Sequence, residues 1–84
     1  MSTEHFLSLT IAHPNSILFT GSVYAVTLPT TEGEITVLAN HEPIIIVLKK
    51  GIITVHVTNQ GKKQMFEISG GVLEISSNKA TVLL

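Results

Sequence analysis

The 84-residue sequence contains no cysteine and no tryptophan, and only 13% of its residues are charged. The absence of cysteine excludes a disulfide framework and a thiolate metal site, although it leaves other metal ligands open. The net charge of −1 provides no electrostatic footprint for nucleic acid or for an anionic membrane. The four aromatic residues are not interleaved with a basic stripe, so a stacking platform for single-stranded nucleic acid is not predicted either.

Long hydrophobic runs are also absent. The longest unbroken apolar run, Ile44–Leu48, has five residues, whereas a helix that spans a bilayer needs about 20. The first residues carry neither a basic region nor a long apolar segment, so no targeting peptide is predicted. We expect residues 1–84 to form one soluble domain in the cytoplasm, which reaches a membrane only through another protein.

Apolar residues recur with a period of two along most of the chain, with glycine, proline or asparagine between the runs. This spacing predicts a small all-β sandwich or barrel, and the lack of a 3.6-residue period predicts almost no helix. A turn is expected at Lys49–Gly51. Ser69–Gly71 is expected to break the strand before it, as a strand bend where glycine permits close approach of another backbone. The predicted strands are 5–12, 17–20, 23–28, 34–38, 44–48, 53–58, 65–68, 72–75 and 80–84.

The chain is organised around the segment 29–43, which begins and ends with proline. Glu32 and Glu34 flank Gly33 in a predicted tight turn, since glycine reaches positive φ at little cost. Two carboxylates could form an acid–base pair, but an exposed turn has nothing to desolvate them. We therefore interpret the turn as a solvated acidic loop that meets a partner.

The run Ile44–Leu48 is apolar on both faces, whereas a strand with one face in water alternates with polar residues. Two interpretations are open. In the first, a neighbouring loop of the same chain covers the outer face of this strand. In the second, which we favour for so small a domain, a partner protein covers that face.

Catalytic and metal-binding patterns are missing from the sequence. The four histidines form neither an HxH nor an HExxH pattern, and surface histidines with local hydrogen bonds are the simpler interpretation. Ser69 does not lie in a G-x-S-x-G elbow, and no glycine-rich phosphate loop precedes a lysine. We predict no enzymatic activity, no metal and no cofactor. The histidines are His5, His13, His41 and His56.

A carrier domain is the alternative from a different functional class. Biotinyl and lipoyl domains are β-sandwiches of similar size that present a modified lysine on a hairpin. Lys49 and Lys50 would lie on such a hairpin if Lys49–Gly51 is a turn. Their neighbours match neither the biotinyl nor the lipoyl motif, because Leu48 and Gly51 replace the expected residues.

Several short segments, taken together in their order along the chain, carry a resemblance to a known protein family. They are Phe19-Thr20-Gly21, Glu32-Gly33-Glu34-Ile35, His41 with Pro43, Lys50-Gly51, the run from Phe66 to Glu74, and Val82-Leu83. In order and spacing, these segments resemble the epsilon subunit of F-type ATP synthases across nearly the whole chain. The resemblance implies an N-terminal β-sandwich of about ten short strands in two sheets.

The resemblance also implies a function. Members of this family are non-catalytic subunits of the central stalk in a proton-translocating synthase, peripheral to the cytoplasmic side of the plasma membrane. They bind the gamma subunit and the ring of c subunits. By this resemblance Glu32, Gly33 and Glu34 contact the c ring. The predicted gamma contacts are His41, Pro43, Ile44 and Ile46.

Family members commonly continue with an α-helical hairpin after the sandwich. This sequence stops at Leu84, where the sandwich would end. We therefore expect the inhibitory arm to be missing from it, and with that arm any binding of ATP or arm-mediated inhibition of ATP hydrolysis.

Overall fold

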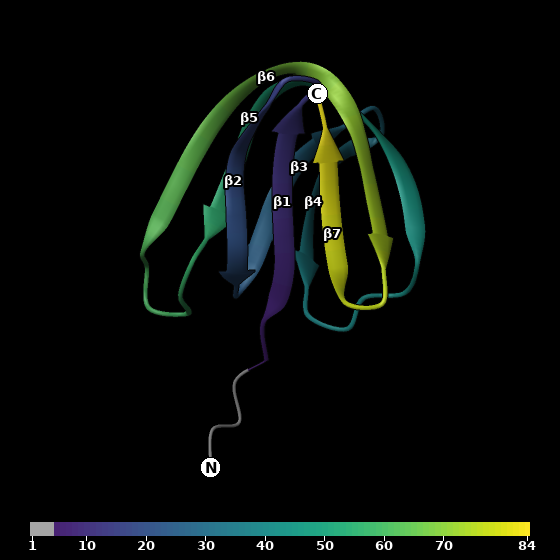
Figure 1. Cartoon of the computed structure of the whole chain (residues 1–84). Helices are drawn as coiled ribbons and strands as arrows, with labels where there is room; N and C mark the ends of the chain where they lie inside the picture. The colour runs from purple at the N-terminus through teal and green to yellow at the C-terminus, as the bar shows by residue number, and fades with distance from the viewer. Residues whose placement is uncertain (1–4) are drawn as a thin grey trace.

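The computed structural model describes residues 5–84, which form seven β-strands in a single sheet (Figure 1). The order across the sheet is β2-β1-β7-β6-β5-β3-β4, and all pairs are antiparallel except β1 with β7. The predicted all-β sandwich class is confirmed. The strands are β1 (Leu7–His13), β2 (Ser16–Val23), β3 (Ala25–Thr30), β4 (Gly33–Leu38), β5 (Ile44–His56), β6 (Lys63–Ser76) and β7 (Lys79–Leu83).

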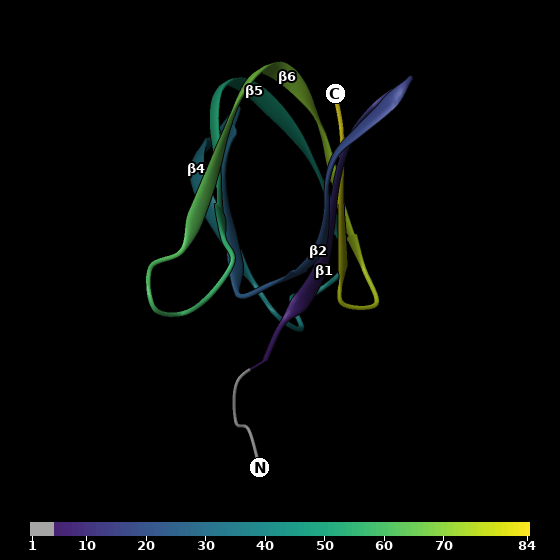
Figure 2. The ribbon, with the colours of Figure 1, turned by 60° about the vertical axis from the view of Figure 1, so that its left-hand side comes forward.

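The sheet folds over on itself because β5 and β6, of 13 and 14 residues, arch together over one end of the molecule (Figures 1 and 2). The first half of β5 and the second half of β6 join β7, β1 and β2 in what we call the first layer. The remaining halves join β3 and β4 in the second layer. Figure 2 shows the two layers facing each other beneath the arch.

The turn predicted at Lys49–Gly51 and the strand break predicted at Ser69–Gly71 are both wrong. The β5–β6 pairing runs from Ile44 with Ile75 to His56 with Lys63, through both segments. The predicted strands on either side of each segment therefore merge, which leaves seven strands in one folded sheet instead of about ten in two.

The strand bend expected at Ser69–Gly71, where glycine permits close backbone approach, is confirmed, and β6 continues through it. Gly71 has φ of +153°, a conformation that side chains with a Cβ rarely adopt. A Cβ on Gly71 would also lie 2.6 Å from the carbonyl oxygen of Leu83 in β7. The close approach of β6 to β7 at the arch therefore depends on glycine.

The positions of Lys49 and Lys50 contradict the alternative that the chain is a biotinyl or lipoyl carrier domain, which required a lysine on a hairpin. Both lysines are exposed within β5, at the bend, and they do not lie at the tip of a hairpin. A modified lysine of the biotinyl or lipoyl type needs that presentation, so this interpretation of the sequence was wrong in its geometry.

The core lies between the two layers and is entirely aliphatic among its fully buried side chains. At one side of the sandwich, the rings of Phe19 in β2 and Phe66 in β6 meet edge to face, with centroids 6.2 Å apart. Within residues 5–84, no helix is long and apolar enough to cross a membrane. The fully buried side chains are Leu7, Leu9, Ile11, Val23, Val26, Leu28, Val37, Ile53, Val55, Leu73, Ile75 and Val82.

Candidate functional site

The acidic turn joins β3 to β4 through the two loop residues Thr31 and Glu32. Thr30 is 2% exposed, and its hydroxyl accepts a hydrogen bond from the Glu32 N–H at 3.1 Å while donating to the Gly33 carbonyl. Gly33 has φ of +118°, with open space where a Cβ would stand. The predicted tight turn is confirmed, and a buried hydroxyl fixes its shape.

The two carboxylates of this turn are both exposed, as a solvated acidic loop requires. Glu32 lies at the tip of the turn. Glu34 lies in β4 opposite Pro29. Its side chain faces outward, because successive side chains of a strand alternate between the two faces and those of Ile35 and Val37 face the core. The turn thus presents negative charge both at its tip and on the outer face of the second layer.

The loop 39–43, which contains His41 and Pro43, lies at the other end of β4 from the acidic turn (Figure 1). A six-residue strand is about 20 Å long, so the predicted c-ring residues and this part of the predicted gamma residues are well separated. His41 and Pro43 are exposed. The His41 Nδ1 atom lies 2.7 Å from the Glu42 carbonyl oxygen, within hydrogen-bond distance.

Asn78 holds this loop to the sheet, and the sequence analysis did not single it out. Its Oδ1 accepts a hydrogen bond from the Asn40 N–H at 2.7 Å, and its Nδ2 donates to the Phe6 carbonyl at 2.9 Å. Its carbonyl accepts a bond from the Ser8 N–H at 3.2 Å. Asn78 has φ of +60° in the hairpin turn between β6 and β7, a conformation that asparagine tolerates.

The first half of β5 shows which face of the apolar run is covered. Leu48 is 3% exposed and Ile46 packs against the core, whereas Ile45 is 71% exposed and Val47 is 57% exposed. Ile44, at the open end of the strand, is 38% exposed. Within residues 5–84, no loop covers the outer face of this strand, which contradicts the first of the two interpretations of this run.

The exposed side chains of this run belong to an apolar row that crosses the whole first layer. The register pairs Val47 with Val72, Val72 with Leu83, Leu83 with Ala12, and Ala12 with Ile17. All but Ala12, which is half-buried, are at least 40% exposed. We call these five residues the apolar row; five strands at about 4.8 Å spacing make it about 19 Å long.

The apolar row lies near the arched end of the sandwich, as does the acidic turn. The Thr31 N–H donates a hydrogen bond to the Val47 carbonyl at 3.3 Å, which ties the turn to the end of the row. A contiguous exposed apolar stripe next to a charged rim is typical of a protein–protein contact surface. Sequence reasoning found Val47 in its run but not the row, since the row depends on long-range register.

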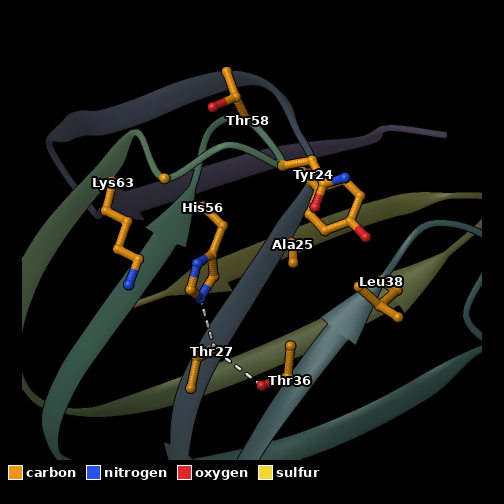
Figure 3. Close-up of a pocket in the computed structure, with 10 residues that line it drawn as sticks. Tyr24, Ala25, Thr27, Thr36, Leu38, His56, Thr58 and Lys63 are labelled. Carbon is orange, nitrogen blue, oxygen red and sulfur yellow. Dashed lines mark hydrogen bonds between the residues drawn. The ribbon is translucent and has the colours of Figure 1, made fainter. Parts of the chain in front are cut away.

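His56 lines a shallow groove on the outer face of the second layer (Figure 3). The His56 Nε2 atom lies 3.1 Å from the Thr27 hydroxyl, which lies 2.9 Å from the Thr36 hydroxyl. Lys63 is the register partner of His56 in β6. The local hydrogen bonding predicted for the histidines is found at His41, whose partner is the adjacent Glu42, whereas the partner of His56 lies 29 residues away in the sequence.

Groups with the composition of a metal site are not found in the part of the chain that the structure describes. The fold and its surfaces define a class: a small β-sandwich that offers other proteins an apolar row and an acidic turn. Residues 6–84 match the family model of the ATP synthase delta/epsilon chain β-sandwich domain. The chain belongs to this family.

Individual relatives agree with this assignment. The chain is 40% identical over 83 residues to an ATP synthase epsilon chain of Rhodopseudomonas palustris (strain TIE-1), which covers 99% of this chain and 58% of the relative. It is 37% identical over 75 residues to an ATP synthase epsilon chain of Caldicellulosiruptor bescii, covering 89% of this chain and 53% of the relative. The chain thus spans a little over half the length of these relatives.

Two solved structures have the same fold. One is a chain in the mitochondrial ATP synthase of Euglena gracilis, determined as an assembly of OSCP, F1 and the c-ring, with a TM-score of 0.86 and 29% identity; the match covers 99% of this chain and 52% of that one. The other belongs to the central stalk and c-ring of the Tetrahymena thermophila mitochondrial ATP synthase, with a TM-score of 0.76 and 16% identity, covering 98% and 65%. The second likeness concerns the fold alone.

Proposed function

We propose that this chain is a non-catalytic subunit of the central stalk in a proton-translocating ATP synthase. It transmits rotation between the ring of c subunits and the gamma subunit, which carries that rotation to the catalytic head. It has no active site of its own and uses no cofactor. It lies on the cytoplasmic side of the plasma membrane and reaches the membrane only through the c ring.

The observation that carries this proposal is that the chain presents two different exposed surfaces, the acidic turn and the apolar side chains on the outer face of the first layer. The acidic turn is short and exposed, and the hydrogen bonds of the Thr30 hydroxyl fix its shape. A turn of this kind can fix the orientation of the chain on the polar loops of the c ring. Ion pairs at such a rim contribute little affinity each, about 0–1 kcal/mol. They set the register of the contact instead. We assign the c-ring contact to Glu32, Gly33 and Glu34.

We expect the gamma contact to be apolar, because burying exposed aliphatic side chains against a partner supplies favourable binding free energy. Within the predicted set of His41, Pro43, Ile44 and Ile46, the two isoleucines face the inside of the sandwich at its open side. Ile45 and Val47 lie next to them and offer more exposed area. We extend the proposed gamma contact to this outward pair.

Copurification tests the proposal. The chain is tagged and expressed in its native host, the membranes are solubilised in mild detergent, and the tagged protein is recovered. Gamma, the c subunit and the catalytic subunits should be recovered with it. Recovery of the chain alone, from membranes in which gamma and the c ring are present, would contradict the proposal.

A further inference from the structure

The first half of β5 is an unprotected sheet edge. β5 pairs with β6 along its whole length, but on its other side its last partner toward the N-terminus is Thr30, opposite Leu48. In Figure 1 this half of β5 borders the sheet. Within residues 5–84, no strand pairs with Ile44–Val47 on that side.

The direction of the free backbone groups follows from one hydrogen bond. The Val47 carbonyl accepts from the Thr31 N–H, so the backbone groups of Val47 point away from β6. Alternate residues of a strand point their N–H and C=O groups to the same side. The N–H and C=O of Ile45 and the N–H of Val47 therefore face the open edge.

The other sheet edges carry devices that hinder pairing with a further strand. β4 has the charged Glu34, and the first half of β6 has Lys63 and Glu67. β2 pairs with β1 through a register shift at Ile11–Ala12, which twists that edge. By contrast, Ile44–Val47 has no charge, no proline and no bulge, which is the composition of an edge that accepts another strand.

A groove of about 570 Å³ runs beside this edge, between the first half of β5 and the β3–β4 hairpin. Its walls include the side chains of Ile35, Ile44 and Ile46, and Glu32 stands on its rim. An added strand would place alternate side chains in this groove. Aliphatic side chains fit the walls, and a basic side chain would pair with Glu32.

We propose that an extended segment of a partner protein adds to the sheet at Ile45–Val47, with aliphatic side chains at alternate positions and a lysine or arginine near Glu32. A second copy of this chain fits less well. It would bring its own β3–β4 hairpin to the same groove and place two Glu32 carboxylates there. Because the partner is taken to be gamma, the inference rests on the proposed function, but it specifies main-chain recognition.

A synthetic peptide tests the edge without gamma. The probe is the acetylated and amidated hexapeptide KTVTVT, in which the lysine and both valines lie on one face of an extended strand, added at millimolar concentration to isotope-labelled chain. Amide shifts should change at Ile45, Val47 and the groove residues, and the same peptide with N-methylated valines should not cause them. Changes that are absent, or that lie elsewhere on the molecule, would overturn the inference.

A backbone substitution then tests recognition of gamma. Because the sequence has no cysteine, the chain can be assembled by ligation at Ala39 through a temporary cysteine that is later desulfurised. An ester in place of the Ile45 amide removes the N–H and keeps the side chain. It should weaken gamma binding at least fivefold and leave the melting temperature unchanged. The matched ester at Ile46, whose N–H faces β6, should lower the melting temperature.

Three outcomes distinguish the possibilities. If the unmodified chain does not bind gamma but the peptide shifts Ile45 and Val47, the proposed function fails and the edge inference stands. If gamma binds the Ile45 ester as tightly as the unmodified chain, the edge inference fails and the proposed function stands. A concentration-dependent dimer whose interface maps to Ile45 would identify a second copy as the occupant and overturn the inference.

Discussion

Substitutions of Asn78 should separate two contributions to the free energy of unfolding. One comes from its side-chain hydrogen bonds, which we call the Asn78 clamp, and the other from its backbone conformation with positive φ. The side chain makes two hydrogen bonds, to the Asn40 N–H and to the Phe6 carbonyl, and each contributes about 1 kcal/mol or less at a half-exposed site. Its φ of +60° adds about 1 kcal/mol of strain for a residue with a Cβ and no local hydrogen bonds.

Three variants divide these contributions. Asn78→Ala loses both bonds and takes on the strain, so its free energy of unfolding should fall by about 2–3 kcal/mol. Asn78→Gly loses the bonds without the strain and should fall by about 1–2 kcal/mol. Asn78→Asp keeps the acceptor for Asn40 and loses the donor to Phe6, which costs about 1 kcal/mol.

Urea denaturation gives the three free energies, and calorimetry should show shifts of about 4–8 °C in melting temperature per kcal/mol for a domain of this size. Amide hydrogen exchange at Asn40 should accelerate in the alanine and glycine variants and stay slow in the aspartate variant. If Asn78→Gly were as stable as the wild type, the clamp would contribute nothing. Equal losses for alanine and glycine would show that the positive φ is unimportant.

Three further predictions concern the two proposed contact surfaces and the arch. Replacing Glu32 and Glu34 together by glutamine should leave the melting temperature within about 2 °C, since exposed charges contribute little to folding, and should reduce ATP-driven proton pumping by the reconstituted complex; unchanged pumping would argue against the turn. Leu48→Asp should abolish folding, as measured by circular dichroism, because it buries an unpaired charge. Val47→Asp should fold normally and lose gamma binding. If both variants unfold, the outward face of this strand is an ordinary buried face. Gly71→Ala should cost about 2–4 kcal/mol in urea denaturation, from backbone strain and the clash with β7, and a wild-type midpoint would contradict the need for glycine there.

The strand positions and their faces could be predicted because period-two alternation is a local property. The continuation of β5 and β6 through their bends could not. In β5 the inward residues change from Ile46 and Leu48 to Ile53 and Val55, so the alternation slips by one position across Lys49–Gly51. A tight turn between two strands shifts the apolar alternation in the same way. Only the unbroken pairing with β6, which joins distant residues, distinguishes the two.

The candidate surfaces divide in the same way. The acidic turn was recognisable because Glu32, Gly33 and Glu34 are adjacent and glycine permits the turn. The apolar row was not, because it is assembled from strands far apart in the sequence and depends on their register. Exposure of Ile45 and Val47 could have been inferred from alternation alone, once Leu48 was assigned to the core.

The continuity of β5 and β6 over the arch has a mechanical consequence. Twelve register pairs join the two strands along their length, and the hydrogen bonds of an antiparallel ladder lie perpendicular to the strands. A pull along the strands therefore loads these bonds together in shear, whereas a pull across an edge would peel them one after another. A force applied at the acidic turn reaches β5 through the Thr31–Val47 hydrogen bond, and β5 and β6 then carry it along continuous backbone into both layers. The sandwich is thus built to behave as a stiff block under twist.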